Sequence, residues 1–120
     1  MILSDRQIKQ ALEAGRVVIT PEPEEDQFAP SAVDLHIGTQ FRTWKPAPGP
    51  VEPLRLSEVN IPSFGDLMED LPTDDEGCVV IRPGQFVLSR TMERVALPAD
   101  SRLAARVEGR SSYARLGLVV

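Results

Sequence analysis

The sequence predicts a mainly β, turn-rich domain, and three observations support this fold class. Eleven prolines and eight glycines are spread through 120 residues without a repeat, which favours short strands joined by turns over a helical bundle. Several short runs, such as 16–20 and 85–91, are rich in β-branched and aromatic residues. The content of 42% hydrophobic and 26% charged residues is typical of a single globular domain.

One helix is expected before the strands begin, over residues 4–14. Ser4 is a favourable N-cap, and Gln7 lies three residues further on, as in a capping box. Apolar residues then recur at helical spacing, and Gly15 suits the position just after the last turn.

Two strand regions follow, separated by an acidic, proline-rich loop over 21–30. The first spans 16–20, and the second is centred on 33–37. Alternation in the second region places Asp34 and His36 on one face of the strand and three apolar residues on the other.

The middle of the chain carries weaker signals. Gly38 is expected to bend the chain before 41–44 resumes the strand. Residues 45–76 form the least organised region, where four prolines come first and an acidic stretch comes last. We expect a long surface loop there, with short pieces of strand.

The pattern becomes clearer from residue 77. Strands over 78–81 and 85–91, joined by a turn at Pro83-Gly84, indicate a hairpin. A further strand is expected over 93–97, and Leu118–Val120 has the character of a strand that begins there.

Charge and composition exclude several classes of function. The net charge of −5 argues against general nucleic-acid binding, and no apolar run approaches the ~20 residues of a membrane span. The first residues lack the apolar stretch of a secretory signal, so we expect a cytoplasmic protein. One cysteine, Cys78, and one histidine, His36, are too few for a His/Cys zinc site within one subunit.

The charge is unevenly distributed. Residues 101–120 carry four arginines and one glutamate, a net charge of +3, which leaves −8 on the first hundred residues. An acidic chain with a basic end suggests a compact site for a small polyanion.

The segment 109–117, Gly-Arg-Ser-Ser-Tyr-Ala-Arg-Leu-Gly, lies in this basic end. One or two helical turns bounded by glycines are expected. Arg110 and the two serines after it would bring a guanidinium, two hydroxyls and backbone N–H groups together, which is the chemistry that recognises phosphate. The alternative is a plain helix N-cap with solvated arginines, because short motifs often arise without function.

Four blocks of the sequence, in this order, resemble the dCTP deaminase family. They are Ile-Leu-Ser-Asp-Arg-Gln-Ile at 2–8, Gln-Phe-Ala-Pro-Ser-Ala-Val-Asp-Leu-His-Ile-Gly at 27–38, the segment 83–98, and the segment 109–118. The related dUTPases share similar motifs, but they usually lack the leading Ser-Asp-Arg helix and tend to have glycine where Ser112 stands. The resemblance implies a dUTPase-like β-clip, a distorted jelly-roll barrel with short helices at the N-terminus and at the Arg-Ser-Ser motif, incomplete at its C-terminus. It also implies a single domain over 1–120 with a variable loop region at 45–76.

The resemblance implies a reaction, the hydrolysis of dCTP to dUTP and ammonia by attack of water on C4 of cytosine. Ser111 and Arg115 are the implied catalytic residues: Ser111 orients the water and the reacting group, and Arg115 lies by the base. Arg110 and Ser112, together with Arg115, would bind the triphosphate. Asp34 matches an aspartate common to the fold, for which we favour a turn or inter-strand hydrogen bond.

No protein-bound metal is implied, because a glutamate activates the water in this family, and Mg²⁺ would accompany the triphosphate. That glutamate belongs to a later block, which would begin just past Val120, so we expect little or no turnover from this chain. The resemblance further implies a homotrimer that binds dCTP and dUTP, with dTTP as a candidate inhibitor, in dUTP and dTTP biosynthesis.

Two other functions stay open. The first is a dUTPase, or a bifunctional deaminase that also cleaves the triphosphate to dUMP and pyrophosphate. The second is a non-catalytic remnant that binds nucleotide or forms oligomers, and it predicts binding of dCTP or dUTP without turnover.

Overall fold

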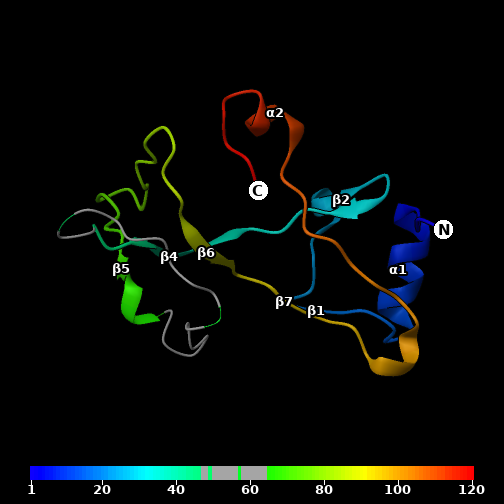
Figure 1. The fold of residues 1–120 in the computed structure, drawn as a ribbon. Helices are drawn as coiled ribbons and strands as arrows, with labels where there is room; N and C mark the ends of the chain where they lie inside the picture. The colour runs from blue at the N-terminus through cyan, green and yellow to red at the C-terminus, as the bar shows by residue number, and fades with distance from the viewer. Residues whose placement is uncertain (47–48, 50–56, 58–64) are drawn as a thin grey trace. The chain divides into compact units, whose positions relative to one another are not determined.

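The computed structural model describes residues 1–46, 49, 57 and 65–120 (Figure 1). The chain divides into two compact units, Met1–His36 with Thr91–Val120, and Ile37–Arg90. Among the described elements, strands outnumber the two short α-helices, which supports the mainly β part of the predicted fold class. These strands form two sheets of two strands and one of three, and no closed barrel is present within the described residues.

The predicted N-terminal helix is confirmed as α1 (Asp5–Glu13). Its capping box is complete: the Gln7 N–H donates to Ser4 Oγ at 3.3 Å, and the Ser4 N–H donates to Gln7 Oε1 at 3.0 Å. Gly15 follows the helix with φ of +66°, a left-handed conformation that favours glycine. None of the helices among the described residues has the length and apolar character needed to cross a membrane.

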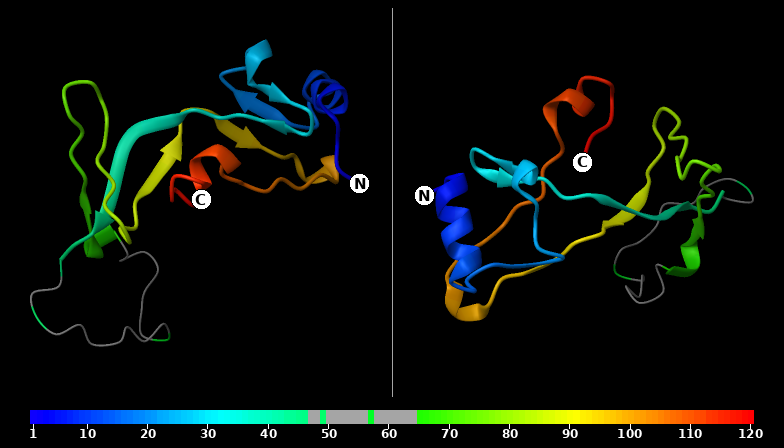
Figure 2. Two further views of the ribbon diagram at one scale, coloured as in Figure 1. Left: turned by 90° about the horizontal axis from the view of Figure 1, so that it is seen from above. Right: turned by 180° about the vertical axis from the view of Figure 1, so that it is seen from behind.

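The strands predicted over 16–20 and 93–97, in the Met1–His36/Thr91–Val120 unit, are also present, in shortened form. β1 (Val18–Thr20) pairs antiparallel with β7 (Arg94–Ala96), with Ile19 opposite Val95. The two strands run side by side in Figure 1 and in both views of Figure 2. A short 3-10 helix, η4 (Ala99–Ser101), follows β7.

The predicted continuous strand around 33–37 is wrong. The loop expected over 21–30 contains η1 (Glu25–Gln27) and β2 (Phe28–Ala29), and β2 pairs with β3 (Ala32–Val33). Residues 34–36 are not in a strand. The Asp34 carbonyl and the His36 N–H bond the side chains of Gln27 and Glu93, while the Asp34 N–H and the His36 carbonyl bond the backbone of Gln27 and Met92.

The Ile37–Arg90 unit contains the three-stranded sheet, in the order β5 (Met68–Asp70), β4 (Ile37–Trp44), β6 (Leu88–Thr91). Gly38, predicted to bend the chain, instead lies inside β4. A Cβ at this position would stand 3.0 Å from the Arg90 carbonyl oxygen, so glycine permits the close approach of the neighbouring backbone.

The predicted hairpin of 78–81 with 85–91 is only partly correct. The turn at Pro83-Gly84 is present, but 78–81 is not in a strand and β6 pairs with β4. Side chains add to that pairing, since Thr43 Oγ1 donates to the Phe86 carbonyl and Ser89 Oγ donates to the Gln40 carbonyl, both at 2.8 Å.

The predicted loop region 45–76 lies partly outside the described residues. Its described part contains β5, a short strand of the kind expected. β5 pairs antiparallel with the end of β4, with Thr43 opposite Glu69.

The helical turn of the basic segment is confirmed as α2 (Ser111–Ala114). Gly117 follows with φ of +91°. Leu118–Val120, predicted to begin a strand, is not in one; the Leu118 N–H donates to the Tyr113 carbonyl at 3.1 Å, which folds the chain back along α2.

The buried side chains differ in kind between the two units. The described residues bury Phe41 and Met68 in the Ile37–Arg90 unit, whereas the buried residues of the other unit are Ala11, Gln27, Glu93 and Ser101. Three of these four are polar, and buried polar groups require hydrogen-bond partners. Gln27 bonds both Glu93 and Asp34, and Asp34 is one of the predicted site residues.

Candidate functional site

Asp34 and Arg110 are brought together although 76 residues separate them. The Arg110 Nε–H donates to Asp34 Oδ1 at 3.3 Å, and Nη2 donates to Asp34 Oδ2. This two-point contact fixes the plane of the guanidinium. In addition to the turn or inter-strand hydrogen bond that we favour for Asp34 from sequence, its carboxylate forms an ion pair with Arg110, a predicted triphosphate-binding residue.

The pair is partly open to solvent. The Arg110 side chain is 56% exposed and that of Asp34 is 33% exposed. The hydrogen bond and the negative charge of Asp34 raise the pKa of Arg110 above its already high ordinary value, so the guanidinium is always charged. Two of its five N–H groups serve Asp34, which leaves three for another partner.

The other predicted site residues flank Arg110 on α2. Ser111 and Ser112 form the first turn of this four-residue helix, both are exposed, and Arg110 is its N-cap residue. Arg115 stands at the opposite end as the C-cap and is also exposed. Within the described part of the chain, the Arg115 guanidinium has no ion-pair or hydrogen-bond partner.

The segment that carries these residues closes on itself. A Cβ added to Gly109 would meet the Val120 side chain at 3.1 Å, so the two ends of 109–120 lie against each other. The Tyr113 and Ala114 N–H groups both donate to the Arg110 carbonyl, at 3.0 and 3.1 Å. Arg110 is therefore held through its backbone by α2 and through its side chain by Asp34.

Asp34 is hydrogen-bonded to a polar network formed by Gln27, Glu93 and His36, which the sequence analysis did not predict. Glu93 Oε2 accepts from the His36 backbone N–H at 2.9 Å, and Glu93 Oε1 accepts from His36 Nδ1 at 2.7 Å. Gln27 Nε2 donates to Glu93 Oε1 at 3.2 Å and to the Asp34 carbonyl at 2.8 Å. No local pattern points to these partners, because Glu93 and His36 are 57 residues apart.

Glu93 is a charged group in a largely enclosed place. Its side chain is 4% exposed, whereas that of His36 is 64% exposed. Burial acts to raise the pKa of Glu93, but the hydrogen bonds from His36 and Gln27 outweigh it, so the pKa lies below its ordinary value. Because the carboxylate is ionised and accepts, His36 Nδ1 carries the proton that it donates.

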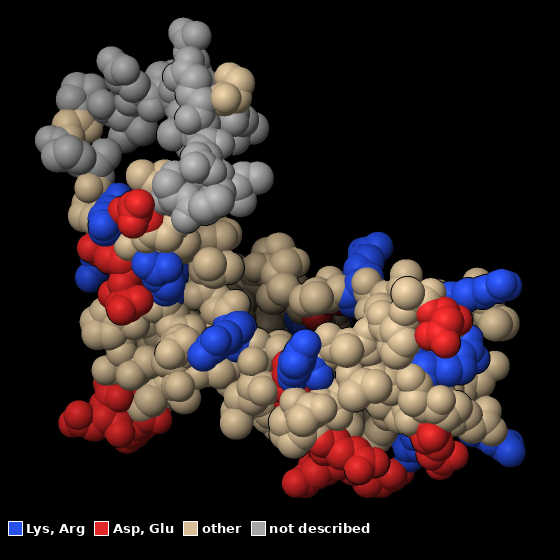
Figure 3. Space-filling model, turned by 90° about the horizontal axis from the view of Figure 1, so that it is seen from below, with Lys and Arg blue, Asp and Glu red and all other residues tan. Residues whose placement is uncertain are grey.

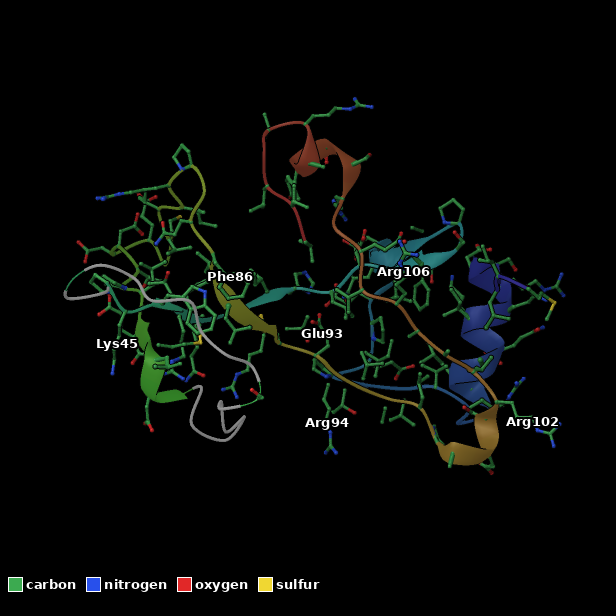
Figure 4. The ribbon with its side chains drawn as sticks, in the orientation of Figure 1. Lys45, Phe86, Glu93, Arg94, Arg102 and Arg106 are labelled. Atoms are coloured by element: carbon green, nitrogen blue, oxygen red, sulfur yellow. The ribbon has the colours of Figure 1, made fainter. Side chains whose placement is uncertain are left out.

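The basic end of the chain is partly neutralised. Arg106 pairs with Glu108 at 2.9 Å, and both side chains are exposed. Figure 4 labels Arg106 on the segment that leads to α2, and Glu93 on the segment that leads into β7. On the face drawn in Figure 3, several acidic side chains gather in patches and the basic side chains are scattered, so this face shows no continuous basic surface of the kind that binds nucleic acid.

Two open hollows elsewhere contain none of the predicted site residues. One, of about 840 Å³, lies in the Ile37–Arg90 unit beside Trp44, whose ring stacks on Phe86 at 5.7 Å. The other, of about 460 Å³, lies beside α1 and includes Arg16 and Arg102. We therefore place the candidate site where Asp34 contacts Arg110 at the start of α2, and not in either of these hollows.

The sequence model of the dCTP deaminase-like family matches residues 2–120 of the chain. The chain belongs to this family. Curated relatives match along the whole of the chain, and they carry two different names.

Among the relatives of this dCTP deaminase-like chain, the "dCTP deaminase, dUMP-forming" of Methanosphaera stadtmanae is 41% identical over 99% of the chain and 57% of its own length. The protein of the same name from Dictyoglomus thermophilum is 44% identical over 100% of the chain and 59% of its own length. The "dCTP deaminase" of Haloarcula marismortui is 42% identical over 100% of the chain and 59% of its own length. The chain thus spans somewhat under three fifths of these relatives.

Proposed function

We propose that the chain binds dCTP and serves its hydrolytic deamination to dUTP and ammonia, within the biosynthesis of pyrimidine deoxynucleotides. The binding residues are Arg110, Ser112 and Arg115, which take the triphosphate, while Ser111 and Arg115 act at the base. In this reaction water adds to C4 of cytosine, the C4–N bond breaks, and the amine leaves as ammonia. The names of the relatives support the substrate, since all three are called dCTP deaminases.

One observation carries the proposal: Arg110 is oriented by Asp34 at two points and sits at the start of α2, next to the exposed hydroxyls of Ser111 and Ser112. A preoriented guanidinium with free N–H groups beside two hydroxyl donors matches phosphate oxygens. Arg115 adds a second positive charge at the other end of the same short helix.

The described residues favour the binding step over proton transfer. Glu93 is enclosed and accepts three hydrogen bonds, Asp34 is engaged by Arg110, and Glu108 is paired with Arg106. A general base needs a carboxylate free to reach the attacking water. None of these three is so placed, so we assign none of them that role.

The remaining features of the proposal concern the whole protein. The two compact units belong to one dCTP deaminase-like domain over 1–120, with 45–76 as its variable region, in a dUTPase-like jelly-roll barrel that assembles as a trimer in the cytoplasm. The chemistry uses no protein-bound metal. Because Arg110 occupies the carboxylate of Asp34, Mg²⁺ would be held by the triphosphate oxygens rather than by this carboxylate.

A second function is favoured by a specific observation. Two of the three relatives described above are named dUMP-forming, so a bifunctional enzyme that releases dUMP and pyrophosphate as well as ammonia is the alternative. Chromatography of the products separates the two, because one reaction ends at dUTP and the other at dUMP.

The test is calorimetric titration of the chain with dCTP, repeated with dUTP and dTTP, followed by product analysis. Arg110→Ala should weaken dCTP binding by on the order of tenfold or more, because a charge-assisted contact to phosphate is lost. Arg6→Ala, which removes an exposed arginine from α1, is the matched control and should bind as the original chain does. Equal affinities for the two variants would refute the site.

A further inference from the structure

The segment 34–36, between β3 and β4, is where the site and the buried network meet. Neither strand continues through it, so its conformation depends on the groups that bond it. Asp34 is bonded on both sides of its backbone: its N–H donates to the Gln27 carbonyl and its carbonyl accepts from Gln27 Nε2, each at 2.8 Å.

Glu93 locks the other end of this segment. Its two carboxylate oxygens accept from the backbone N–H and the ring Nδ1 of His36, and the Met92 N–H donates to the His36 carbonyl at 2.8 Å. Glu93 also accepts from the same Gln27 amide that bonds Asp34. One enclosed carboxylate therefore ties together the residues on either side of Leu35.

We propose that Glu93 is a positioning residue for nucleotide binding: by clamping 34–36 through Gln27 and His36, it holds the Asp34 carboxylate in the place from which that carboxylate orients Arg110. This inference rests on the proposed function for its substrate. Glu93 itself touches no ligand, because its side chain is enclosed and its oxygens are occupied.

The physical reason is preorganisation. An exposed arginine has many rotamers, and fixing them on binding costs free energy that a preformed ion pair removes. Asp34 supplies the ion pair with Arg110, but a half-buried carboxylate on a segment without its own backbone bonds would itself be mobile. Residues 34–36 lack the support of strand pairing, and the hydrogen bonds from Glu93 and Gln27 hold them in place instead.

The test is a double-mutant cycle on dCTP affinity at neutral pH. Glu93→Gln keeps the size of the side chain and should weaken binding by about tenfold, on the order of the loss expected when preorganisation of one charged contact is removed. In an Asp34→Asn background the same change should have little further effect, because Glu93 acts through Asp34. Equal losses in both backgrounds would overturn the proposal.

A matched control and a direct readout separate positioning from general loss of structure. Glu22→Gln makes the same chemical change at an exposed position and should leave affinity unchanged. Hydrogen exchange of the Arg110 Nε–H, followed by NMR, should be faster in Glu93→Gln than in Glu22→Gln. An unchanged exchange rate at Arg110 would refute the coupling.

Two further measurements distinguish failure of this proposal from unfolding of the variant and from failure of the proposed function. If circular dichroism shows Glu93→Gln to be unfolded, Glu93→Asp takes its place, since it keeps the charge but withdraws it by one methylene. If the original chain binds no dCTP, the proposed function fails, whereas the Arg110 exchange rates still decide whether Glu93 positions this arginine.

Discussion

The enclosed carboxylate of Glu93 gives the most informative stability prediction. In Glu93→Gln, either orientation of the new amide leaves a donor facing a donor. If the oxygen faces His36 Nδ1 and Gln27, the NH₂ faces the His36 backbone N–H; if it is turned, the NH₂ faces Gln27 Nε2. At least one hydrogen bond to a charged group is therefore lost, which costs about 1.5–3 kcal/mol of unfolding free energy.

This loss should depend on pH, and its sign follows from the lowered pKa of Glu93. A carboxyl group whose pKa is lower in the folded chain than in the unfolded chain stabilises the folded state. This stabilisation is fully present when the pH is above the unfolded pKa of 4.5, and it is lost as the pH falls through the lower pKa of the folded chain. The original chain should thus exceed Glu93→Gln in stability at neutral pH. The difference should shrink as the pH falls below about 4.5.

The measurement is urea unfolding followed by far-ultraviolet circular dichroism, at several pH values between about 3 and 7. Glu22→Gln serves as the control and should differ from the original chain by less than about 0.5 kcal/mol throughout. The assigned hydrogen bonds would be refuted if the difference in unfolding free energy between Glu93→Gln and the original chain stayed constant with pH. The absence of any difference at neutral pH would refute them too.

Three further predictions follow from single contacts. Ser4→Ala removes the α1 N-cap and should cost about 1 kcal/mol by the same unfolding assay, and an unchanged midpoint would contradict the capping box. Gly38→Ala forces a methyl against the Arg90 carbonyl and should cost about 1–3 kcal/mol, seen as faster hydrogen exchange of β4 amides; unaltered exchange would show that the strands separate freely. Arg115→Ala should weaken dCTP binding by on the order of tenfold without changing the unfolding midpoint, and a lower midpoint with unchanged binding would assign Arg115 a structural role instead.

Elements with local signals were predicted well from the sequence. α1 was predicted with its cap because Ser4 and Gln7 lie three residues apart and bond each other directly. The turn at Pro83-Gly84 and the helical turn at 111–114 were likewise predicted from residues that lie within them.

Elements that depend on distant partners were predicted poorly. Alternation around 33–37 is compatible with a strand, and the pattern gives no sign that the side chains of Gln27 and Glu93 bond part of this backbone. The strand at 85–91 was predicted to pair with 78–81, but β6 pairs with β4, and nothing within 85–91 indicates this partner.

The candidate site shows the same division. The phosphate chemistry of Arg110 and the serines after it was predicted from one continuous motif, and the resemblance to dCTP deaminases gave it a substrate. The ion pair of Arg110 with Asp34 and the hydrogen bonds of Glu93 with His36 and Gln27 join residues 57 to 76 positions apart, and a single sequence contains no signal for such pairings.

The chain's only tryptophan and only tyrosine fall in different compact units, Trp44 in Ile37–Arg90 and Tyr113 in the other. Indole fluorescence excited at long wavelength will therefore report on one unit alone, whereas far-ultraviolet circular dichroism reports on the backbone of both. Following both signals through a single denaturation would reveal whether the units melt as one cooperative body or in succession, with no label added.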